Sequence, residues 1–408
     1  MDRTALDQWE NWSGSVSFDP RALYEPADED ELRELVARAG DEGRQVRVVG
    51  SGHSATGILE TDDLLVTLDR LSGVADHDGD SHEATVLAGT TLGEAGNELL
   101  EYDLGMPNFG DVSTQTLAGA ISTGTHGTGK DLPCLSTMLI GGRMVTADGD
   151  VRTFDADSDP QLLRAARVSL GTLGILTHLR LDLRPSYKLQ RREYCTSWRD
   201  AEAHIPDLVE QNRNFDFYWY PRSDEVKLRL LNPPGGGTDH EAIDEYATLT
   251  EDRIGWAHQI IPKHSHIPRK FDEMEYAVPF EDGLACFREV RDRVRDEWRH
   301  HVGWRLLWRT VAPDDSYLSP SRGRETVTVS LHQNAELDYE AYFSDVEPIL
   351  RAYDGRPHWA KKHSLRAPEL RELYPEWDRF QQFRAELDPD GVFTSDYLQE
   401  LLGEVGQA

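Results

Sequence analysis

The chain has 408 residues, a length that favours two domains because one hydrophobic core rarely serves so many residues. Its 74 acidic and 43 basic side chains give a net charge of −31, and this field repels the phosphates of nucleic acids and anionic lipids. We therefore expect no nucleic-acid partner. Only seven of the basic residues are lysines, and acidic residues are spread along the whole chain, as on the surface of a halophilic protein or an acidic mesophilic enzyme.

The sequence has no feature typical of secretion or of a membrane span. Residues 1–18 carry neither a basic segment nor an apolar run, and no stretch is long and apolar enough to cross a bilayer. The three cysteines, Cys134, Cys195 and Cys286, show no CxxC spacing and cannot form a disulfide framework. We therefore expect a cytoplasmic protein.

Short strands dominate the elements predicted in the first half of the chain. A helix is expected over residues 28–40, strands over 45–49, 64–68 and 84–88, a helix from a capping box at Thr91 and Glu94 to about 102, a hairpin of 138–147 and 151–154 around Asp148-Gly149, and a strand over 175–184 that ends at Pro185. These strands do not alternate regularly with helices. The predicted fold class is therefore α+β, with a first domain over residues 1–185.

The second predicted domain, residues 186–408, also mixes strands with helices. Strands are expected over 217–220, 225–231 and 326–332, and helices over 280–298, 339–353 and 366–373. The fold class is again α+β.

A glycine-rich turn in the first domain imitates a dinucleotide-binding pattern. Gly50, Gly52 and Ala55 fit GxGxxA, and Asp69 lies downstream where that pattern has an acidic residue. Such a crossover takes at least about 10 to 12 residues, helix included, whereas residues 54–63 are short and have no amphipathic period. Two interpretations remain: a loop whose backbone N–H groups bind a diphosphate, and a plain tight turn.

A second segment, residues 105–129, also carries almost no bulky side chains. It would let a flat polar ligand lie against the main chain, with serine and threonine hydroxyls as hydrogen-bond partners. A flexible linker is the alternative, but linkers lack interleaved residues such as Leu117, Ile121 and His126. His53 is the one bulky residue of the glycine turn and is either a functional residue or a surface residue.

Three motifs, in this order, carry a resemblance to one family of flavoenzymes. They are Val48-Val49-Gly50-Ser51-Gly52-His53-Ser54, Gly124-Thr125-His126-Gly127-Thr128-Gly129 and His358-Trp359-Ala360-Lys361-Lys362-His363. The chain resembles the vanillyl-alcohol-oxidase (PCMH) type of FAD enzymes, and within it the sugar-1,4-lactone and alditol oxidases. The resemblance covers nearly the whole chain. It implies a two-domain FAD-binding fold in which residues from about 355 to 408 pack back on the flavin.

The resemblance implies FAD as the cofactor and His53 as the residue bonded to the 8α-methyl group of the flavin. Gly110 matches a position against the reactive face of the ring, where the missing Cβ implies open access for oxygen. Ile175 matches a position whose backbone meets the adenine end. The other implied FAD-binding residues are Gly50, Ser51, Gly52, Ser54, Asp111, Ser113, Thr114, Gly119, Ser122, Thr123, Gly124 and His126.

The resemblance also implies which groups lie beside the flavin. Arg309 and Lys361 match two cations of the family, and surface ion pairing is the alternative for both. The family's Glu, two residues before the Arg, is replaced by Leu307. This departure puts the usual substrate in question, because a carboxylate would accept hydrogen bonds from substrate hydroxyls. We expect His332 to act as the proton acceptor instead.

No metal site is expected. His358 and His363 have an HxxxxH spacing, but no third ligand lies near them in the sequence. The adjacent Lys361 and Lys362 would repel a cation.

The sequence therefore predicts an FAD-dependent oxidoreductase that oxidises a CH–OH group of a sugar, alditol or aldonolactone. Oxygen or an electron carrier would be the acceptor. One alternative is an NAD-dependent dehydrogenase that uses the GxGxxA pattern. Another is a non-catalytic flavin- or sugar-binding protein, which the replacement by Leu307 makes conceivable.

Overall fold

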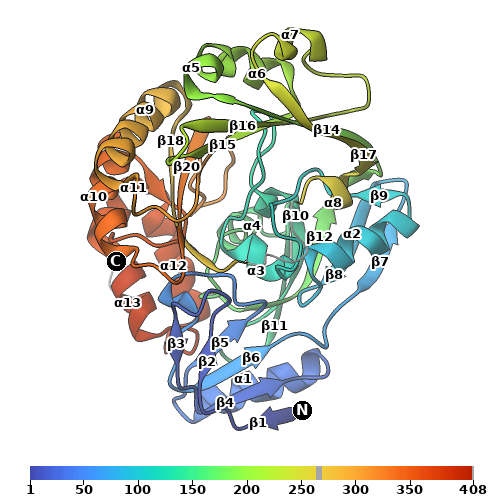
Figure 1. The fold of residues 1–408 in the computed structure, drawn as a ribbon. Coiled ribbons are helices and arrows are strands. Elements are labelled where there is room, and N and C mark those ends of the chain that lie inside the picture. Colours follow the sequence, from blue (N-terminus) through green and yellow to red (C-terminus); the bar gives the residue numbers. More distant parts are fainter. Residues whose placement is uncertain (263–268, 407–408) are drawn as a thin grey trace.

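The computed structural model describes residues 1–262 and 269–406 and has the predicted α+β class (Figure 1). Strands before residue 186 form a four-stranded sheet, a five-stranded sheet and two two-stranded pairs, whereas strands after it form one sheet of eight. The domain boundary at about residue 185 stays a prediction, and this division of the strands is compatible with it.

The four-stranded sheet has the order β1-β4-β6-β5. Its strands are β1 (Asp2–Thr4), β4 (Ala22–Glu25), β5 (Val46–Val49) and β6 (Leu64–Thr67). Helix α1 (Glu29–Asp41) begins at Asp28, whose side chain accepts a hydrogen bond from the Glu31 N–H. Strands β5 and β6 are parallel, and the segment between them contains the 3-10 helix Gly57–Leu59 and no α-helix. The glycine turn therefore does not open a dinucleotide-binding crossover helix.

The five-stranded sheet is antiparallel, in the order β11-β10-β12-β8-β7. Its strands are β7 (Val74–Asp78), β8 (Glu83–Leu87), β10 (Leu139–Val145), β11 (Val151–Asp155) and β12 (Ile175–Asp182). Strands β10 and β11 form the predicted hairpin. Around the sheet lie α2 (Leu92–Glu101), which has the predicted capping box, α3 (Leu117–Ser122), the 3-10 helix Leu135–Met138 and α4 (Pro160–Ala166).

Two short antiparallel pairs complete the first half. Strand β2 (Trp9–Glu10) pairs with β3 (Ser17–Phe18), and β9 (Leu104–Gly105) pairs with β13 (Arg184–Pro185). The strand expected to end at Pro185 ends at Asp182 instead, and Pro185 is the last residue of β13.

The eight-stranded sheet has the order β17-β14-β16-β15-β19-β20-β18-β21, and all its pairs are antiparallel. Its strands are β14 (Lys188–Ser197), β15 (Asn214–Tyr220), β16 (Glu225–Asn232), β17 (Thr248–Trp256), β18 (Phe271–Pro279), β19 (Leu306–Val311), β20 (Thr326–Asn334) and β21 (Arg356–Pro357). Strands β18, β19 and β20 form one wall of the cavity described below.

Helices cover the outer side of this sheet in Figure 1. They are α5 (Trp198–Ala201), the 3-10 helix Glu202–His204, α6 (Ile205–Gln211), α7 (His240–Asp244), α9 (Gly283–Arg293) and α10 (Glu340–Ala352), while α8 (Ala257–Ile260) follows β17 and packs near α2. The single helix expected over residues 280–298 is divided into the 3-10 helix Phe280–Asp282, α9 and the π-helical turn Val294–Trp298.

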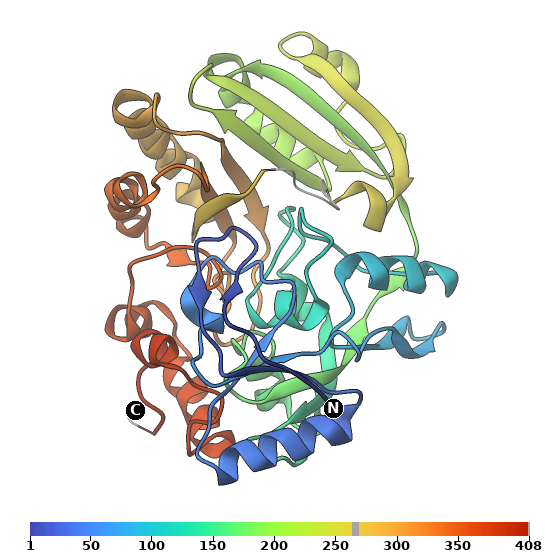
Figure 2. The ribbon, with the colours of Figure 1, turned by 60° about the horizontal axis from the view of Figure 1, so that its bottom comes forward.

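The C-terminal tail returns to the first half of the chain, beside α1 (Figure 2). It comprises α11 (Ala367–Leu373), α12 (Trp377–Leu387) and α13 (Asp396–Leu402). The Val46 N–H donates a 2.7 Å hydrogen bond to the Val392 carbonyl, and the Arg47 guanidinium donates one of 2.6 Å to the Phe393 carbonyl. Val392 and Phe393 also join the apolar core under the first sheet. Residues 407–408 of the predicted tail lie outside the described residues.

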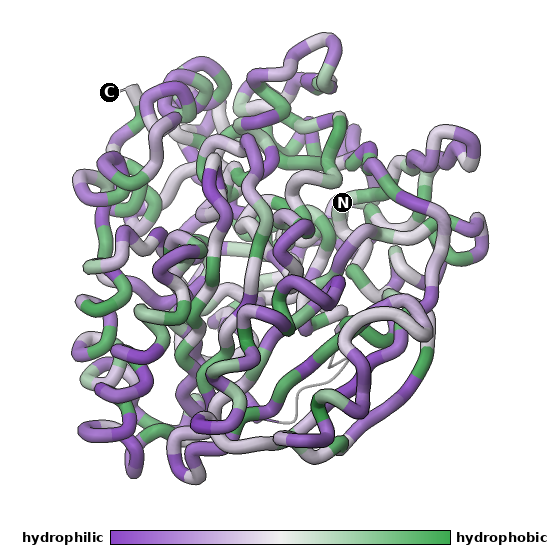
Figure 3. Tube along the Cα trace, turned by 90° about the horizontal axis from the view of Figure 1, so that it is seen from above, coloured by the Kyte–Doolittle hydropathy of each residue, from purple (hydrophilic) through white to green (hydrophobic). Residues whose placement is uncertain are grey.

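Hydrophilic residues occur along the whole chain and are not gathered in one segment (Figure 3). Within the described ranges, no helix combines the length and the apolar character that crossing a bilayer requires.

Candidate active site

A cavity lies between the first half of the chain, the large sheet and the segment of residues 358–361. It contains about 1660 Å³ of space, part of which opens to solvent. One wall is made by residues 47–54, 110–126 and 170–176, and the other by strands β18 to β20 together with residues 358–361.

Most residues singled out from the sequence line this cavity. They are Gly50, Ser51, Gly52, His53, Ser54, Gly110, Asp111, Gly119, Ser122, Thr123, His126, Ile175, Arg309, His332 and Lys361. Three others are not among its lining residues. The Ser113 carbonyl accepts a hydrogen bond from the Gly93 N–H, Thr114 is exposed, and Gly124 packs near Pro320. Their implied role in FAD binding stays a prediction.

The N-terminal hairpin of β2 and β3 holds the glycine turn in place. The Asn11 amide donates a 2.9 Å hydrogen bond to the Ser54 carbonyl, and the Trp12 N–H donates one of 2.8 Å to the Gly52 carbonyl. Gly52 has φ +67°, a conformation that glycine adopts without strain. Because the hairpin is remote in sequence from the turn, no local pattern predicts these contacts.

His53 faces the cavity and packs on the indole of Trp12, with ring centroids 4.7 Å apart. Burial, and then the nearby positive charge of Lys361, lower the pKa of His53 to about 4. At neutral pH the imidazole is therefore uncharged and keeps a nitrogen lone pair, as bond formation to an electrophilic carbon requires.

Residues 105–129, here called the small-residue run, bring main chain to the cavity wall. A Cβ atom on Gly50 would lie 2.1 Å from the Thr116 hydroxyl oxygen, and one on Gly119 would lie 2.9 Å from the same atom. Both glycines are therefore required for this close approach. The run also contains the short helix α3, which the sequence analysis did not predict, and the apolar residues Leu117 and Ile121 fix it to the core.

Asp111 lines the cavity but is already engaged by protein groups. Arg229 contacts its carboxylate at 2.6 Å, and the Tyr218 hydroxyl donates a 2.8 Å hydrogen bond to it. Burial would raise the pKa of Asp111, but Arg229 and Arg309 hold it below its ordinary value. This carboxylate therefore fixes the loop after Gly110 to the large sheet.

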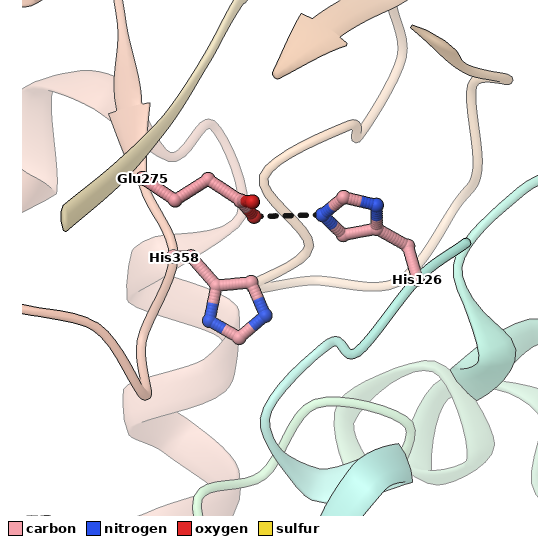
Figure 4. Close-up of side chains that lie close together, drawn as sticks. All are labelled: His126, Glu275 and His358. Carbon is pink, nitrogen blue, oxygen red and sulfur yellow. Dashed lines mark hydrogen bonds and ion pairs between the residues drawn. The ribbon is translucent and has the colours of Figure 1, made fainter. Parts of the chain in front are cut away.

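Three buried side chains from distant segments meet in the cavity: His126, Glu275 of β18 and His358 (Figure 4). The two His126 ring nitrogens each lie 2.8 Å from an oxygen, Nδ1 from the Gly127 carbonyl and Nε2 from the Glu275 carboxylate. His126 is therefore fixed between the main chain of its own segment and strand β18.

Arg309 completes this cluster. Its guanidinium lies 2.5 Å from the other Glu275 oxygen, to which Ser330 also donates. Burial would raise the pKa of Glu275, but the charges of Arg309 and His126 hold it well below the ordinary value. Arg309 is thus a buried residue of the cavity wall, not a member of a surface ion pair.

The cluster has the atoms of a metal site, but its groups already have partners within the protein. Glu275 pairs with Arg309, and both His126 ring nitrogens lie within hydrogen-bond distance of oxygens. The His358 Nδ1 accepts a hydrogen bond from the Ala360 N–H, so its proton is on Nε2, and burial lowers its pKa to about 3. We assign these groups to the network and not to metal binding. His363, the other half of the HxxxxH spacing, is not among the lining residues.

A second buried carboxylate, Glu273, lies two residues earlier in β18. It contacts the Lys361 ammonium group, and its other oxygen lies 3.5 Å from the His332 Nε2. The His332 Nδ1 lies 3.1 Å from the Arg305 carbonyl, an acceptor, so the ring proton is on Nδ1 and Nε2 carries a lone pair. Burial lowers the pKa of His332 to about 4.

Two carboxylates line the cavity although Leu307 stands at the position of the family's Glu. Leu307 of β19 is in register with Ser330 of β20, and Ser330 is in register with Glu275 of β18. Leu307, Ser330 and Glu275 therefore form one row across β19, β20 and β18. The carboxylate of this row lies on β18, two strands away from Leu307. The acidic character of the site is therefore retained, and Leu307 adds an apolar patch to its wall.

The cavity wall fits FAD. Among the described residues, no acceptor is found for the backbone N–H groups of residues 51–54, and these small residues leave those donors open to an anionic diphosphate. The ring side of the cavity offers the uncharged imidazole of His53 and the cations Arg309 and Lys361. The uncharged His53 ring could form a covalent bond to the flavin, and the two cations would stabilise an anionic reduced flavin.

The first half of the chain and its C-terminal part match two known families. Residues 20–155 match the FAD binding domain, and residues 257–401 match D-arabinono-1,4-lactone oxidase. The chain is 34% identical to the L-gulono-1,4-lactone dehydrogenase of Mycobacterium tuberculosis, with 97% of this chain and 99% of the relative covered. The chain belongs to the FAD-dependent sugar-lactone and alditol oxidoreductase family. FAD is the cofactor of this oxidoreductase, and an NAD-dependent dehydrogenase is not favoured.

Other relatives of this oxidoreductase carry related names. The alditol oxidase of a Streptomyces species is 30% identical, with 96% of this chain and 98% of that protein covered. Among solved structures, cholesterol oxidase from B. sterolicum superposes with a TM-score of 0.83 at 15% identity, covering 97% and 96% of the two chains. The glucooligosaccharide oxidase of Acremonium strictum, described as having an 8α-N1-histidyl FAD, gives 0.77 at 16% identity, covering 97% and 94%. The predicted two-domain FAD-binding fold is confirmed.

Proposed function

We propose that this oxidoreductase oxidises a secondary or primary CH–OH group of an aldonolactone or alditol, and that His332 takes the hydroxyl proton. The observation that carries the proposal is the 3.1 Å contact between the His332 Nδ1 and the Arg305 carbonyl oxygen, which can only accept a hydrogen bond. The Arg305 carbonyl fixes the proton on Nδ1, which leaves the Nε2 lone pair beside Glu273 and Lys361 on the cavity wall. An uncharged imidazole held in this way is a competent general base.

The cations of the wall have separate roles in the proposal. FAD, when bound, supplies the two-electron acceptor for the hydride that leaves the substrate carbon. Lys361 supplies positive charge that favours reduction and donates to the substrate oxygen. Arg309 is held by Glu275 and the His126 carbonyl, and it fixes the position of the β18 to β20 wall against the small-residue run.

The cofactor would be covalently attached through His53, and molecular oxygen would be the acceptor. The first proposal is supported by the uncharged ring of His53 in the cavity. The second is supported by Gly110, which lines the cavity without a side chain. The free state of Cys134, Cys195 and Cys286 suits the reducing cytoplasm, where we propose that the protein acts.

A substrate screen tests the proposal. Purified yellow enzyme is mixed anaerobically with aldonolactones, alditols and aldoses, and flavin absorbance near its visible maximum is followed. We expect at least one lactone or alditol to bleach the flavin, and a simple aliphatic alcohol to serve as the negative control. A flavin that every sugar-derived compound leaves oxidised would reject the proposal in favour of a non-catalytic flavin- or sugar-binding protein.

A further inference from the structure

Glu273 is a buried carboxylate that joins the two groups assigned to the chemistry. It lies in β18, with 5% of its surface exposed, and it lines the cavity. One oxygen contacts Lys361, which follows β21, and the other lies 3.5 Å from the Nε2 of His332 in β20. Strand register explains the second contact, because Glu273 and His332 are direct partners across β18 and β20.

We propose that Glu273 is a positioning residue of the oxidation: it orients Lys361 and stabilises the imidazolium that forms when His332 accepts the substrate proton. This inference rests on the function proposed above and names a residue that the sequence analysis did not identify. If Glu273 contacted Lys361 alone, a structural ion pair would explain it. Its second oxygen lies near the Nε2 of the proposed base His332, and an ion pair does not explain that contact.

The transfer of the substrate proton explains the contact between Glu273 and His332. The substrate O–H bond breaks and an Nε2–H bond forms on His332, while the C–H electron pair leaves with the hydride to the bound FAD. Before the step, the Nε2 lone pair and the Glu273 carboxylate are both acceptors and do not attract one another. After the step, His332 carries a positive charge, and its Nε2 lies 3.5 Å from the Glu273 carboxylate, so the contact becomes an attraction between opposite charges in a poorly solvated cavity.

The charges around His332 show why a carboxylate is needed. Arg305, just before β19, and Lys361, after β21, both lower the pKa of His332, and burial lowers it most. Glu273 is the carboxylate that raises it. Without Glu273, a proton on His332 would face two cations in a poorly solvated cavity, and the oxidation would have to form that unfavourable state.

The test measures anaerobic flavin reduction by stopped flow in Glu273→Gln, Glu273→Asp and Glu273→Ala. We expect the Gln variant, which keeps shape but not charge, to reduce its flavin at least about tenfold more slowly at saturating substrate. The Asp variant should recover part of the rate. The matched control is Glu347→Gln, which removes a buried carboxylate that binds the Tyr276 hydroxyl and the Ser364 N–H outside the cavity.

Chemical rescue separates positioning from folding. Formate should restore part of the reduction rate of Glu273→Ala, because it can supply a carboxylate in the space left by the side chain. It should not accelerate Glu347→Ala. A second measurement needs no turnover: formate should perturb the visible spectrum of the oxidised Glu273→Ala enzyme in a saturable way and leave the wild-type spectrum unchanged.

Each outcome bears on one proposal. A wild-type flavin that no sugar-derived compound reduces contradicts the proposed function. A wild type that is reduced, together with a Glu273→Gln variant that binds FAD and is reduced equally fast, overturns the role of Glu273. So does a slow Glu273→Gln variant if Glu347→Gln is slowed equally, or if formate neither binds to nor rescues Glu273→Ala.

Discussion

The imidazole of His53 packs on the indole of Trp12, and the backbone N–H of Trp12 donates a hydrogen bond to the Gly52 carbonyl. The ring that would carry the flavin is therefore oriented by a hairpin 40 residues earlier in the chain. We predict that acid-precipitated wild-type protein stays yellow and that the His53→Ala pellet releases its colour into the supernatant. Colour released equally from both proteins would contradict the tether.

Trp12 gives an independent prediction for the same bond. Trp12→Ala removes the surface that fixes the His53 ring but leaves the nitrogen that would form the bond. We expect a mixture of bound and released flavin in the acid-precipitation assay, measured by absorbance of the two fractions. Phe18→Ala is the matched control, because Phe18 packs on Trp9 in the same hairpin and does not line the cavity.

Lys361 and Lys362 are neighbours with different surroundings. Lys361 lines the cavity and contacts Glu273, whereas Lys362 lies over the Tyr339 ring, 4.6 Å from its centroid, and is not among the lining residues. Lys361→Met should slow anaerobic flavin reduction at least tenfold, about 1.4 kcal/mol of transition-state stabilisation. Lys362→Met should change this rate much less. Equal effects of the two substitutions would refute the assignment of Lys361.

The lowered pKa of His332 predicts an unusual pH profile. Burial lowers this pKa to about 4, while Glu273 opposes the shift and Arg305 and Lys361 reinforce it. The base is therefore uncharged above pH 5.5, and flavin reduction should be independent of pH from 5.5 to about 8. A base with the ordinary histidine pKa of about 6.5 would instead lose half of its rate at that pH. His332→Asn should lower the rate by about 100-fold.

Gly110 gives a prediction about the electron acceptor. A Cβ atom at this position would lie 3.3 Å from the Thr125 methyl carbon and 3.6 Å from the His126 carbonyl oxygen, and Gly110 is not among the residues of positive φ. Gly110→Ala should therefore fold and bind FAD with small adjustments. We expect normal reduction by substrate and slower reoxidation in air, measured by stopped flow. A wild-type reduced enzyme that is inert to oxygen but reduces a dye would show that the protein is a dehydrogenase.

The ring nitrogens of His363 are closed to solvent, which predicts sensitivity to acid. Burial lowers the pKa of His363 to about 3. The unfolded chain, with a pKa of about 6.5, then binds more protons, so stability falls as pH falls below that value. The loss amounts to at most about 2 kcal/mol between pH 7 and pH 5. His363→Met should lose less stability over this range in urea unfolding, and an equal loss would contradict the assignment.

The sequence alone determined the features that depend on local spacing. Residues 54–63 are too few and too irregular for a crossover helix, so the GxGxxA pattern was recognisable as something other than a dinucleotide-binding turn, and the structure contains a 3-10 helix there. The lack of bulk over residues 105–129 likewise predicted main chain at a ligand surface. The first conclusion needs only the length and pattern of one segment, and the second needs only the sizes of neighbouring side chains.

Tertiary structure decided which charged groups meet. Glu273 and Glu275 alternate with Met274 and Tyr276, a pattern that from sequence is typical of a strand with one face in water. The fold instead covers that face with the small-residue run and the tail, so both carboxylates are buried and need cationic partners. Those partners come from other elements, because strand order and register place them there, and no local pattern specifies pairings over such distances.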